Sequence, residues 1–99
     1  MKSISKIWKY PLETIGEPQK IMMPKGAKIR FIHDQNGVPT IWAEVQPGES
    51  LKPRWFGIYG TNHALPEYTE QFKHKYIGSS MSGPFVWHIY ELDGRAFGK

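Results

Sequence analysis

Residues 27–46 read AKIRFIHDQNGVPTIWAEVQ, two runs of alternating apolar and polar residues on either side of Asn36 and Gly37. A period of two is typical of a half-buried β-strand, and Asn-Gly between two such runs is a strong hairpin signal. The stretch therefore predicts a β-hairpin, with strands expected at Ala27 to Asp34 and Thr40 to Gln46.

The length of the hairpin loop decides which side chains face each other. A two-residue turn at Asn36 and Gly37 would place Phe31 opposite Trp42, mixing the apolar set of one strand with the polar set of the other. A three-residue loop with Gly37 in the left-handed conformation gives one apolar face instead. Its pairs would be Phe31 with Ile41, Ile29 with Ala43, and Ala27 with Val45. We therefore predict the three-residue loop.

The same register sets the pairs on the opposite face. These are Lys28 with Glu44, Arg30 with Trp42, and Ile32 with Thr40. Arg30 beside Trp42 has two interpretations, both of which stay open here. The two side chains can form a self-contained cation–π pair, or they can be half of a platform that holds a planar anionic ligand.

Short runs rich in Ile, Val, Trp, Tyr and Phe recur along the rest of the chain between Gly, Pro and Asn residues, which predicts a mostly β fold. Five further strands are expected, at Ile4 to Tyr10, Gln19 to Met23, Arg54 to Tyr59, Lys75 to Ser79 and Phe85 to Leu92. Leu65 to Lys73 is the one place for a helical turn. At 99 residues we expect a single domain, 1–99, folded as a compact β-sandwich or partly open barrel of about seven strands with at most one short helix.

Composition excludes several classes of protein. The chain has no cysteine, which rules out a disulfide framework, thiolate metal sites and cysteine nucleophiles. No apolar window approaches membrane-spanning length, so we expect a cytoplasmic protein. The net charge of +4 and the pI near 9.4 favour anionic partners, although a few charges also serve solubility.

Arg54 to His63 is the candidate ligand-binding segment, because an apolar strand there runs into the polar loop Tyr59-Gly60-Thr61-Asn62-His63. It is no Walker motif, since it lacks the glycine-lysine pair, but its backbone and side chains can donate hydrogen bonds to an anion. The alternative is a tight turn in which Thr61 and Asn62 bond to the backbone.

Other chemistry finds little support. No two of the four histidines have useful ligand spacing, so we expect no metal and no cofactor. Thr61 and His63 could act as nucleophile and base, but they stand in no recognisable catalytic motif, and we expect no enzyme activity. Lys6 to Tyr10 and Arg54 to Phe56 interleave rings with cations, as nucleic-acid-binding surfaces do. Without a known fingerprint, nucleic acid ranks below a small nucleotide.

The chain contains the motifs KIWKYPL (6–12), MPKGA (23–27), QNGVP (35–39), YGTNH (59–63), Trp42-Ala43 and Tyr76-Ile77-Gly78. Together these motifs resemble a family of small proteins, without established activity, from bacteriophages and bacterial genomes. The resemblance covers nearly the whole chain. The family loop usually reads Tyr-Gly-Thr-Gly-His, and Asn62 stands where its second glycine would be. Because asparagine tolerates left-handed backbone well, the loop shape is expected to survive.

The resemblance implies a non-enzymatic phage-type accessory protein that counters host defence, and we expect it to bind a nucleotide-like anionic signal. The ligand-binding residues would be Arg30, Trp42, Arg54, Tyr59, Thr61 and His63. The alternative is a protein–protein inhibitor that occupies a host defence enzyme or a nucleoprotein complex. A homodimer is also expected. Binding is favoured if Arg30 and Trp42 lie beside the Tyr59 to His63 loop; if they lie on opposite faces, the loop is a well-made turn.

Overall fold

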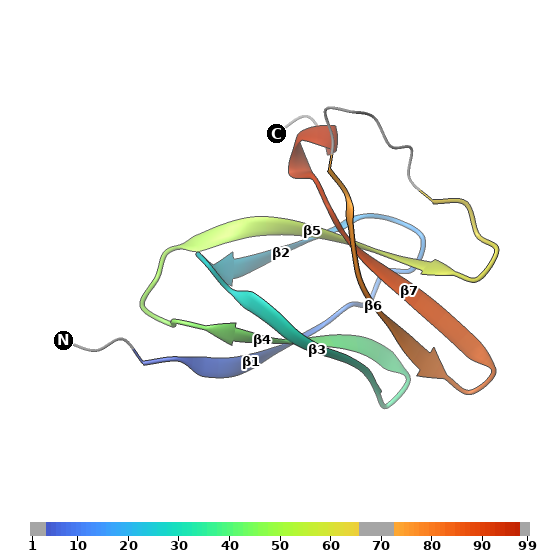
Figure 1. Ribbon diagram of the computed structural model, residues 1–99, viewed down its shortest axis with the longest axis horizontal. Coiled ribbons are helices and arrows are strands. Elements are labelled where there is room, and N and C mark those ends of the chain that lie inside the picture. Colours follow the sequence, from blue (N-terminus) through green and yellow to red (C-terminus); the bar gives the residue numbers. More distant parts are fainter. Residues whose placement is uncertain (1–3, 66–72, 98–99) are drawn as a thin grey trace.

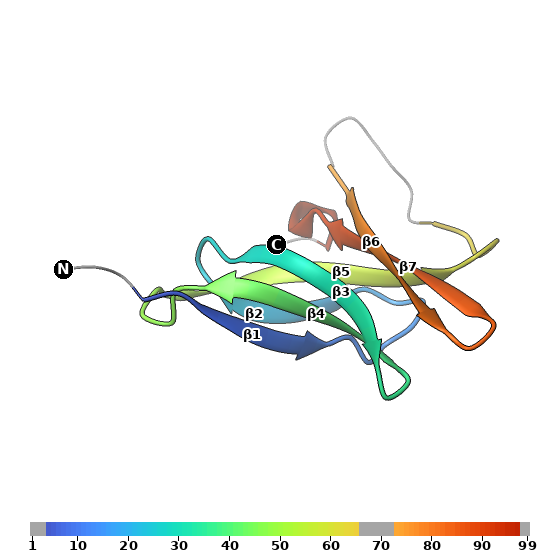
Figure 2. The same ribbon diagram turned by 60° about the horizontal axis from the view of Figure 1, so that its bottom comes forward.

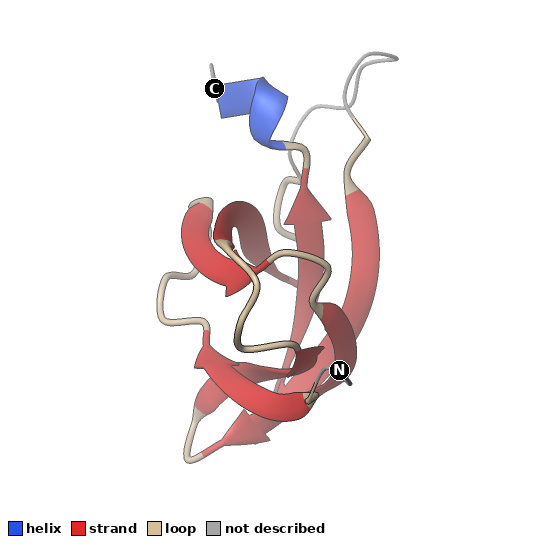
Figure 3. Ribbon diagram, turned by 90° about the vertical axis from the view of Figure 1, so that its left-hand side faces the viewer, coloured by secondary structure: helices blue, strands red, loops and turns tan. Residues whose placement is uncertain are grey.

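The computed structural model describes residues 4–65 and 73–97, which form two antiparallel β-sheets (Figure 1). The strands are β1 (Lys6–Pro11), β2 (Gln19–Pro24), β3 (Lys28–Gln35), β4 (Val38–Val45), β5 (Leu51–Gly60), β6 (Lys75–Ser82) and β7 (Phe85–Leu92). One sheet has the order β1-β4-β3 and the other β2-β5-β7-β6. A short 3-10 turn, η1 (Gly94–Phe97), follows β7 (Figure 3).

The predicted mostly β fold is confirmed. Seven antiparallel strands form two sheets that do not close on each other, so the fold is a sandwich rather than a barrel. Figure 2 shows the three-stranded sheet lying across β2 and β5 of the other sheet. Residues 66–72 of the predicted helical turn lie outside the described residues, and η1 was not predicted.

The strand bounds differ most at β5, which begins at Leu51 instead of Arg54. Pro53 would argue against a strand in the middle of a sheet, because it has no N–H to donate. Here β7 pairs with β5 only from Trp55 onward, so at Pro53 the strand has one neighbour, Met22 of β2. Proline is tolerated because this part of β5 is an edge.

The core lies between the inner faces of the two sheets. Ile41 and Ala43 of β4 are fully buried there, as are Phe56 and Ile58 of β5 and Ile89 of β7. Side chains alternate across a strand, so Trp42, between Ile41 and Ala43, and Tyr59, directly after Ile58, are on the outer faces. Burial of this apolar set is the main force that holds the sheets together.

The β3–β4 hairpin has a two-residue turn, so the predicted three-residue loop is wrong. Asn36 has φ 55° and Gly37 has φ 87°, and positive φ at both central residues is what a type I′ turn requires. Gln35 pairs with Val38 across the turn. The Asp34 carboxylate also accepts a hydrogen bond of 3.0 Å from the Gly37 N–H.

A β-bulge at Arg30 makes this turn compatible with the buried core. Phe31 pairs with Trp42, but the register shifts by one residue across Arg30, so that Ile29 pairs with Ala43. The extra residue lets Ile29 and Ile32 both pack against the core, which a regular strand would not allow. The predicted pairs Lys28 with Glu44 and Ile29 with Ala43 are confirmed. The pairs Phe31 with Ile41, Arg30 with Trp42, and Ile32 with Thr40 are wrong, and Ala27 precedes β3 and does not join the ladder with Val45.

Candidate functional site

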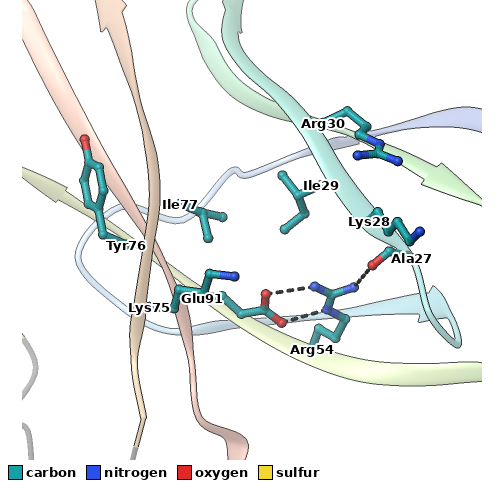
Figure 4. Close-up of a pocket in the computed structure, with 9 residues that line it drawn as sticks. All are labelled: Ala27, Lys28, Ile29, Arg30, Arg54, Lys75, Tyr76, Ile77 and Glu91. Atoms are coloured by element: carbon teal, nitrogen blue, oxygen red, sulfur yellow. Dashed lines mark hydrogen bonds and ion pairs between the residues drawn. The ribbon is translucent and has the colours of Figure 1, made fainter.

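A cleft of about 460 Å³ opens between the two sheets, where β3 packs against β6 (Figure 4). Its apolar lining comes from Ala27, Ile29 and Ile77, with Tyr76 beside them. Its charged lining consists of Lys28, Arg30, Arg54, Lys75 and Glu91. Four cationic side chains and one carboxylate therefore line the cleft, and a second carboxylate, that of Glu44, pairs with Arg30.

Arg54 is held rigidly on the β5 side of this cleft. Its Nε and Nη2 atoms donate hydrogen bonds of 2.7 and 2.8 Å to the two oxygens of Glu91, and its Nη1 atom donates to the Ala27 carbonyl at 2.6 Å. Such a bidentate pair fixes orientation as well as charge. The hydrogen bond to Glu91 raises the pKa of Arg54 although burial opposes it, so the guanidinium stays charged.

Tyr10 of β1 lies close enough to Arg54 for their charges to interact. Burial raises the pKa of the Tyr10 hydroxyl, while the positive charge of Arg54 acts in the opposite direction. The hydroxyl oxygen is buried and has no hydrogen-bond partner among the described residues. Burying a hydroxyl without a hydrogen bond costs folding free energy, and this cost applies to the Tyr10 oxygen beside the Arg54 cation.

The other three cations of the cleft are less constrained. Arg30 pairs with Glu44, Nη2 to Oε1 at 2.9 Å, but its side chain is 52% exposed. Lys28 on β3 and Lys75 on β6 make no ion pair with any residue in 4–65 or 73–97. These two ammonium groups come from opposite sides of the cleft and are available to an anion.

The six predicted ligand-binding residues do not gather at one place. Arg30 and Arg54 line the cleft from different sheets. Trp42 lies on the outer face of the three-stranded sheet, where its ring centroid is 5.5 Å from that of Phe31. Tyr59 is only 6% exposed and packs edge-on against Tyr90 at 6.1 Å. Its ring is therefore already occupied by protein contacts.

Thr61 and His63 belong to the loop after β5, and both side chains have hydrogen-bond partners, His88 of β7 for Thr61 and Gly60 for His63. His63 Nδ1 accepts a hydrogen bond of 3.1 Å from the Gly60 N–H, and the His63 N–H donates to the Gly60 carbonyl at 3.0 Å. The His63 ring fills the space that a Cβ on Gly60 would need. Asn62 has φ 75°, the left-handed conformation expected from its place in the motif. Thr61 Oγ1 lies 3.0 Å from His88 Nε2.

This loop lines cavities other than the cleft. One, of about 250 Å³, includes Thr61, His63, Tyr76 and His88, and another, of about 460 Å³, lies against Phe85 and Trp87. Arg30 and Trp42 line neither of these two cavities. The loop itself is closed by the two hydrogen bonds between His63 and Gly60.

Sequence reasoning missed Lys28, Lys75 and Glu91 in the cleft and His88 beside Thr61. Glu91 follows Arg54 by 37 residues, and only the β5–β7 register brings them together. Lys75 lies opposite Glu91 in the β6–β7 ladder. A correct prediction of which strands pair would therefore have placed both Lys75 and Glu91 beside Arg54.

Within the described part of the chain, no group of three or more His, Asp or Glu side chains gathers closely enough to hold a metal ion. None of its helical segments is long and apolar enough to cross a membrane.

Residues 3–96 match a family model described as a domain of unknown function, DUF7352. The chain belongs to this family. The DUF7352 match includes all seven strands and therefore both the cleft and the Tyr59 to His63 loop. Comparisons with curated proteins and with solved structures found no match.

Proposed function

We propose that this DUF7352 protein is a non-enzymatic binding protein whose cleft between β3 and β6 captures a small, phosphate-bearing, nucleotide-like anion. The observation that carries the proposal is the charge of the lining, four cations against one carboxylate. A volume of about 460 Å³ is within the range of about 300–1,000 Å³ common for small-ligand sites.

Different lining residues of the cleft make different contacts with the anion. Lys28 and Lys75 have no ion-pair partner among the described residues, so they contact phosphate oxygens from the two sides. Arg54 uses Nε, Nη1 and Nη2 for hydrogen bonds to Glu91 and Ala27, so it acts as a fixed positive charge. Ile29 and Ile77 supply apolar surface for the sugar or base.

The biological setting that we propose is a phage-type accessory protein that removes such a signal from the host cytoplasm and so counters host defence. Its support is the resemblance of the motifs around Tyr10, Ala27, Gly37 and Asn62 to a phage and bacterial family. The geometry adds support only for anion binding.

The second candidate is a protein–protein inhibitor of a host defence enzyme or nucleoprotein complex. The observation that favours it is the exposure of large apolar side chains at Ile7, Met81 and Phe85, since exposed apolar surface often marks a protein contact. The same side chains would serve the proposed homodimer, which sedimentation velocity over a concentration series would detect.

Thermal unfolding with a panel of cyclic nucleotides, dinucleotides and ADP-ribose derivatives at fixed salt tests the capture proposal. A ligand that binds only the folded state must raise the midpoint. We expect Lys75→Glu to remove the shift and the control Lys20→Glu, an exposed lysine on β2, to retain it. The absence of any shift at millimolar ligand would overturn the proposal.

A further inference from the structure

The outer face of the three-stranded sheet has three neighbouring aromatic rings. The centroid of the Phe31 ring lies 5.5 Å from that of His33, with the rings nearly parallel at 18°. The Phe31 centroid is also 5.5 Å from that of Trp42, with the rings tilted by 50°. Phe31 is 54% exposed and His33 is exposed as well. We call Phe31, His33 and Trp42, together with Lys9 and Arg30, the aromatic face.

Strand register places these side chains together. Ile41 and Ala43 point into the core, so Trp42 between them points outward. Directly opposite residues of antiparallel strands share a face. Lys9 of β1 and Phe31 of β3 are the two cross-strand partners of Trp42, and the aromatic face therefore spans all three strands.

Cations flank the rings on both sides. Lys9 is exposed next to Trp42 and makes no ion pair within the described segments. The bulge places Arg30 beside Phe31, and both side chains are exposed, because a bulge re-aims one side chain out of the regular alternation. Glu44 is the carboxylate next to them, and it is already paired with Arg30.

We propose that the aromatic face binds single-stranded nucleic acid, with bases stacked on Phe31, His33 and Trp42 and phosphates beside Lys9 and Arg30. Proteins that bind single strands without sequence preference combine aromatic stacking surfaces with a positively charged track. The core of a protein–protein interface is depleted of charge, whereas here cations border the rings on two strands. The net charge of +4 favours the polyanion further.

Fluorescence anisotropy with labelled oligo(dT) and oligo(U) of about 15 nucleotides tests this proposal, since one module commonly covers about 4–16 nucleotides. We expect Phe31→Ala to weaken binding by about tenfold, the loss of one stacked base. Phe85→Ala is the matched control. Phe85 is 59% exposed and stacks on Trp87 at 5.7 Å, but it belongs to the other sheet, and its removal should leave the affinity unchanged.

The proposed contact between Lys9 and phosphate is tested separately, by the salt dependence of binding. We expect Lys9→Ala to lower the salt dependence of binding by about one unit of slope, and Lys20→Ala to leave the slope unchanged. Absence of binding at about 100 µM protein in low salt, the weak limit for non-specific complexes, would overturn the proposal. Equal losses for Phe31→Ala and Phe85→Ala would overturn it too.

Of the residues of the aromatic face, Arg30 also lines the cleft, whereas Lys9, Phe31, His33 and Trp42 do not. Lys75→Glu changes the cleft but not the aromatic face, so it should abolish the nucleotide-induced thermal shift and leave most of the oligonucleotide affinity. If Lys75→Glu abolishes oligonucleotide binding and Phe31→Ala does not, the strand binds in the cleft and the aromatic face is not the site.

Discussion

The Tyr59 ring lies over Gly57 on the outer face of the four-stranded sheet. Its hydroxyl oxygen is 2.5 Å, and its Cε2 atom 2.7 Å, from the position that a Cβ on Gly57 would occupy. Tyr59 is nearly buried and also packs against Tyr90. A glycine is therefore required at position 57, because the Tyr59 ring fills the space that any larger side chain would need.

Gly57→Ala should destabilise the protein by about 1–3 kcal/mol, the usual cost of overpacking a filled site, because the Tyr59 ring has to move. Urea unfolding monitored by tryptophan fluorescence measures this change. Gly48→Ala is the control, since a Cβ at Gly48 meets nothing within 4 Å. It should be neutral or slightly stabilising, and equal costs for the two variants would contradict the argument.

Breaking the Arg54–Glu91 pair should cost about 1–3 kcal/mol of unfolding free energy. Each side chain is three-quarters buried, and removal of one partner leaves the other as a partly buried charge without its ion pair. Arg54→Ala should cost more than Glu91→Ala, because it also removes the hydrogen bond to the Ala27 carbonyl. A double-mutant cycle in urea separates the two contributions.

The exposed pair Arg30–Glu44 is the comparison for this cycle. With side chains 52% and 37% exposed, it should contribute no more than about 1 kcal/mol. A coupling energy for Arg54 and Glu91 no larger than that for Arg30 and Glu44 would show that burial does not strengthen the cleft pair.

Asp93 should make stability depend on acid pH. Hydrogen bonds from the Arg95 side chain, then from backbone N–H groups, lower the pKa of this carboxyl well below its ordinary value. A lowered folded-state pKa contributes stability above the unfolded value of about 3.9, and that stability is lost as pH falls through the folded value. Asp93→Asn should lower the melting temperature at pH 6, and the difference should shrink steadily below about pH 4. Glu49→Gln, which removes one exposed charge, should show no such trend.

Asn62 allows a test of the turn after β5. Because its φ is 75°, Asn62→Ala should cost about 1 kcal/mol, since alanine keeps the Cβ but lacks the short polar side chain that helps asparagine adopt left-handed backbone. Asn62→Gly should be neutral or better, because glycine adopts this conformation freely. Thermal unfolding of the two variants measures the difference, and equal melting temperatures would mean that the turn relaxes to another shape.

The presence of the strands was predictable, because apolar–polar alternation and the turn residues between the strands can be read from short stretches of sequence. All seven predicted strands are present, and the bounds of β7, Phe85–Leu92, are those expected. The hairpin loop was not predictable, because the bulge at Arg30 shifts the register and no glycine or proline at that position indicates a bulge. In a regular ladder, a two-residue turn would pair apolar with polar side chains and is inconsistent with the core.

The candidate site was less predictable than the fold. Arg30 and Arg54 were selected from sequence and do line one cleft, but the partner of Arg54 comes from a strand 37 residues away. Tyr59 looked like a free ring, because sequence does not reveal that Gly57 leaves room for it. Local patterns identify strands, while sites depend on which strands become neighbours.

The order of strands along the chain has a consequence for synthesis on the ribosome. The three-stranded sheet is complete once Val45 has been made, whereas β2 has no partner until β5 appears. β7 is made after both of its neighbours, takes the place between β5 and β6 and brings Ile89 to the core. Until β5 has been made, the apolar face of β4 lacks Phe56 and Ile58, the buried side chains of the opposite sheet that join it in the core. The nascent chain exposes this face for that interval, and exposed apolar surface of this kind favours aggregation.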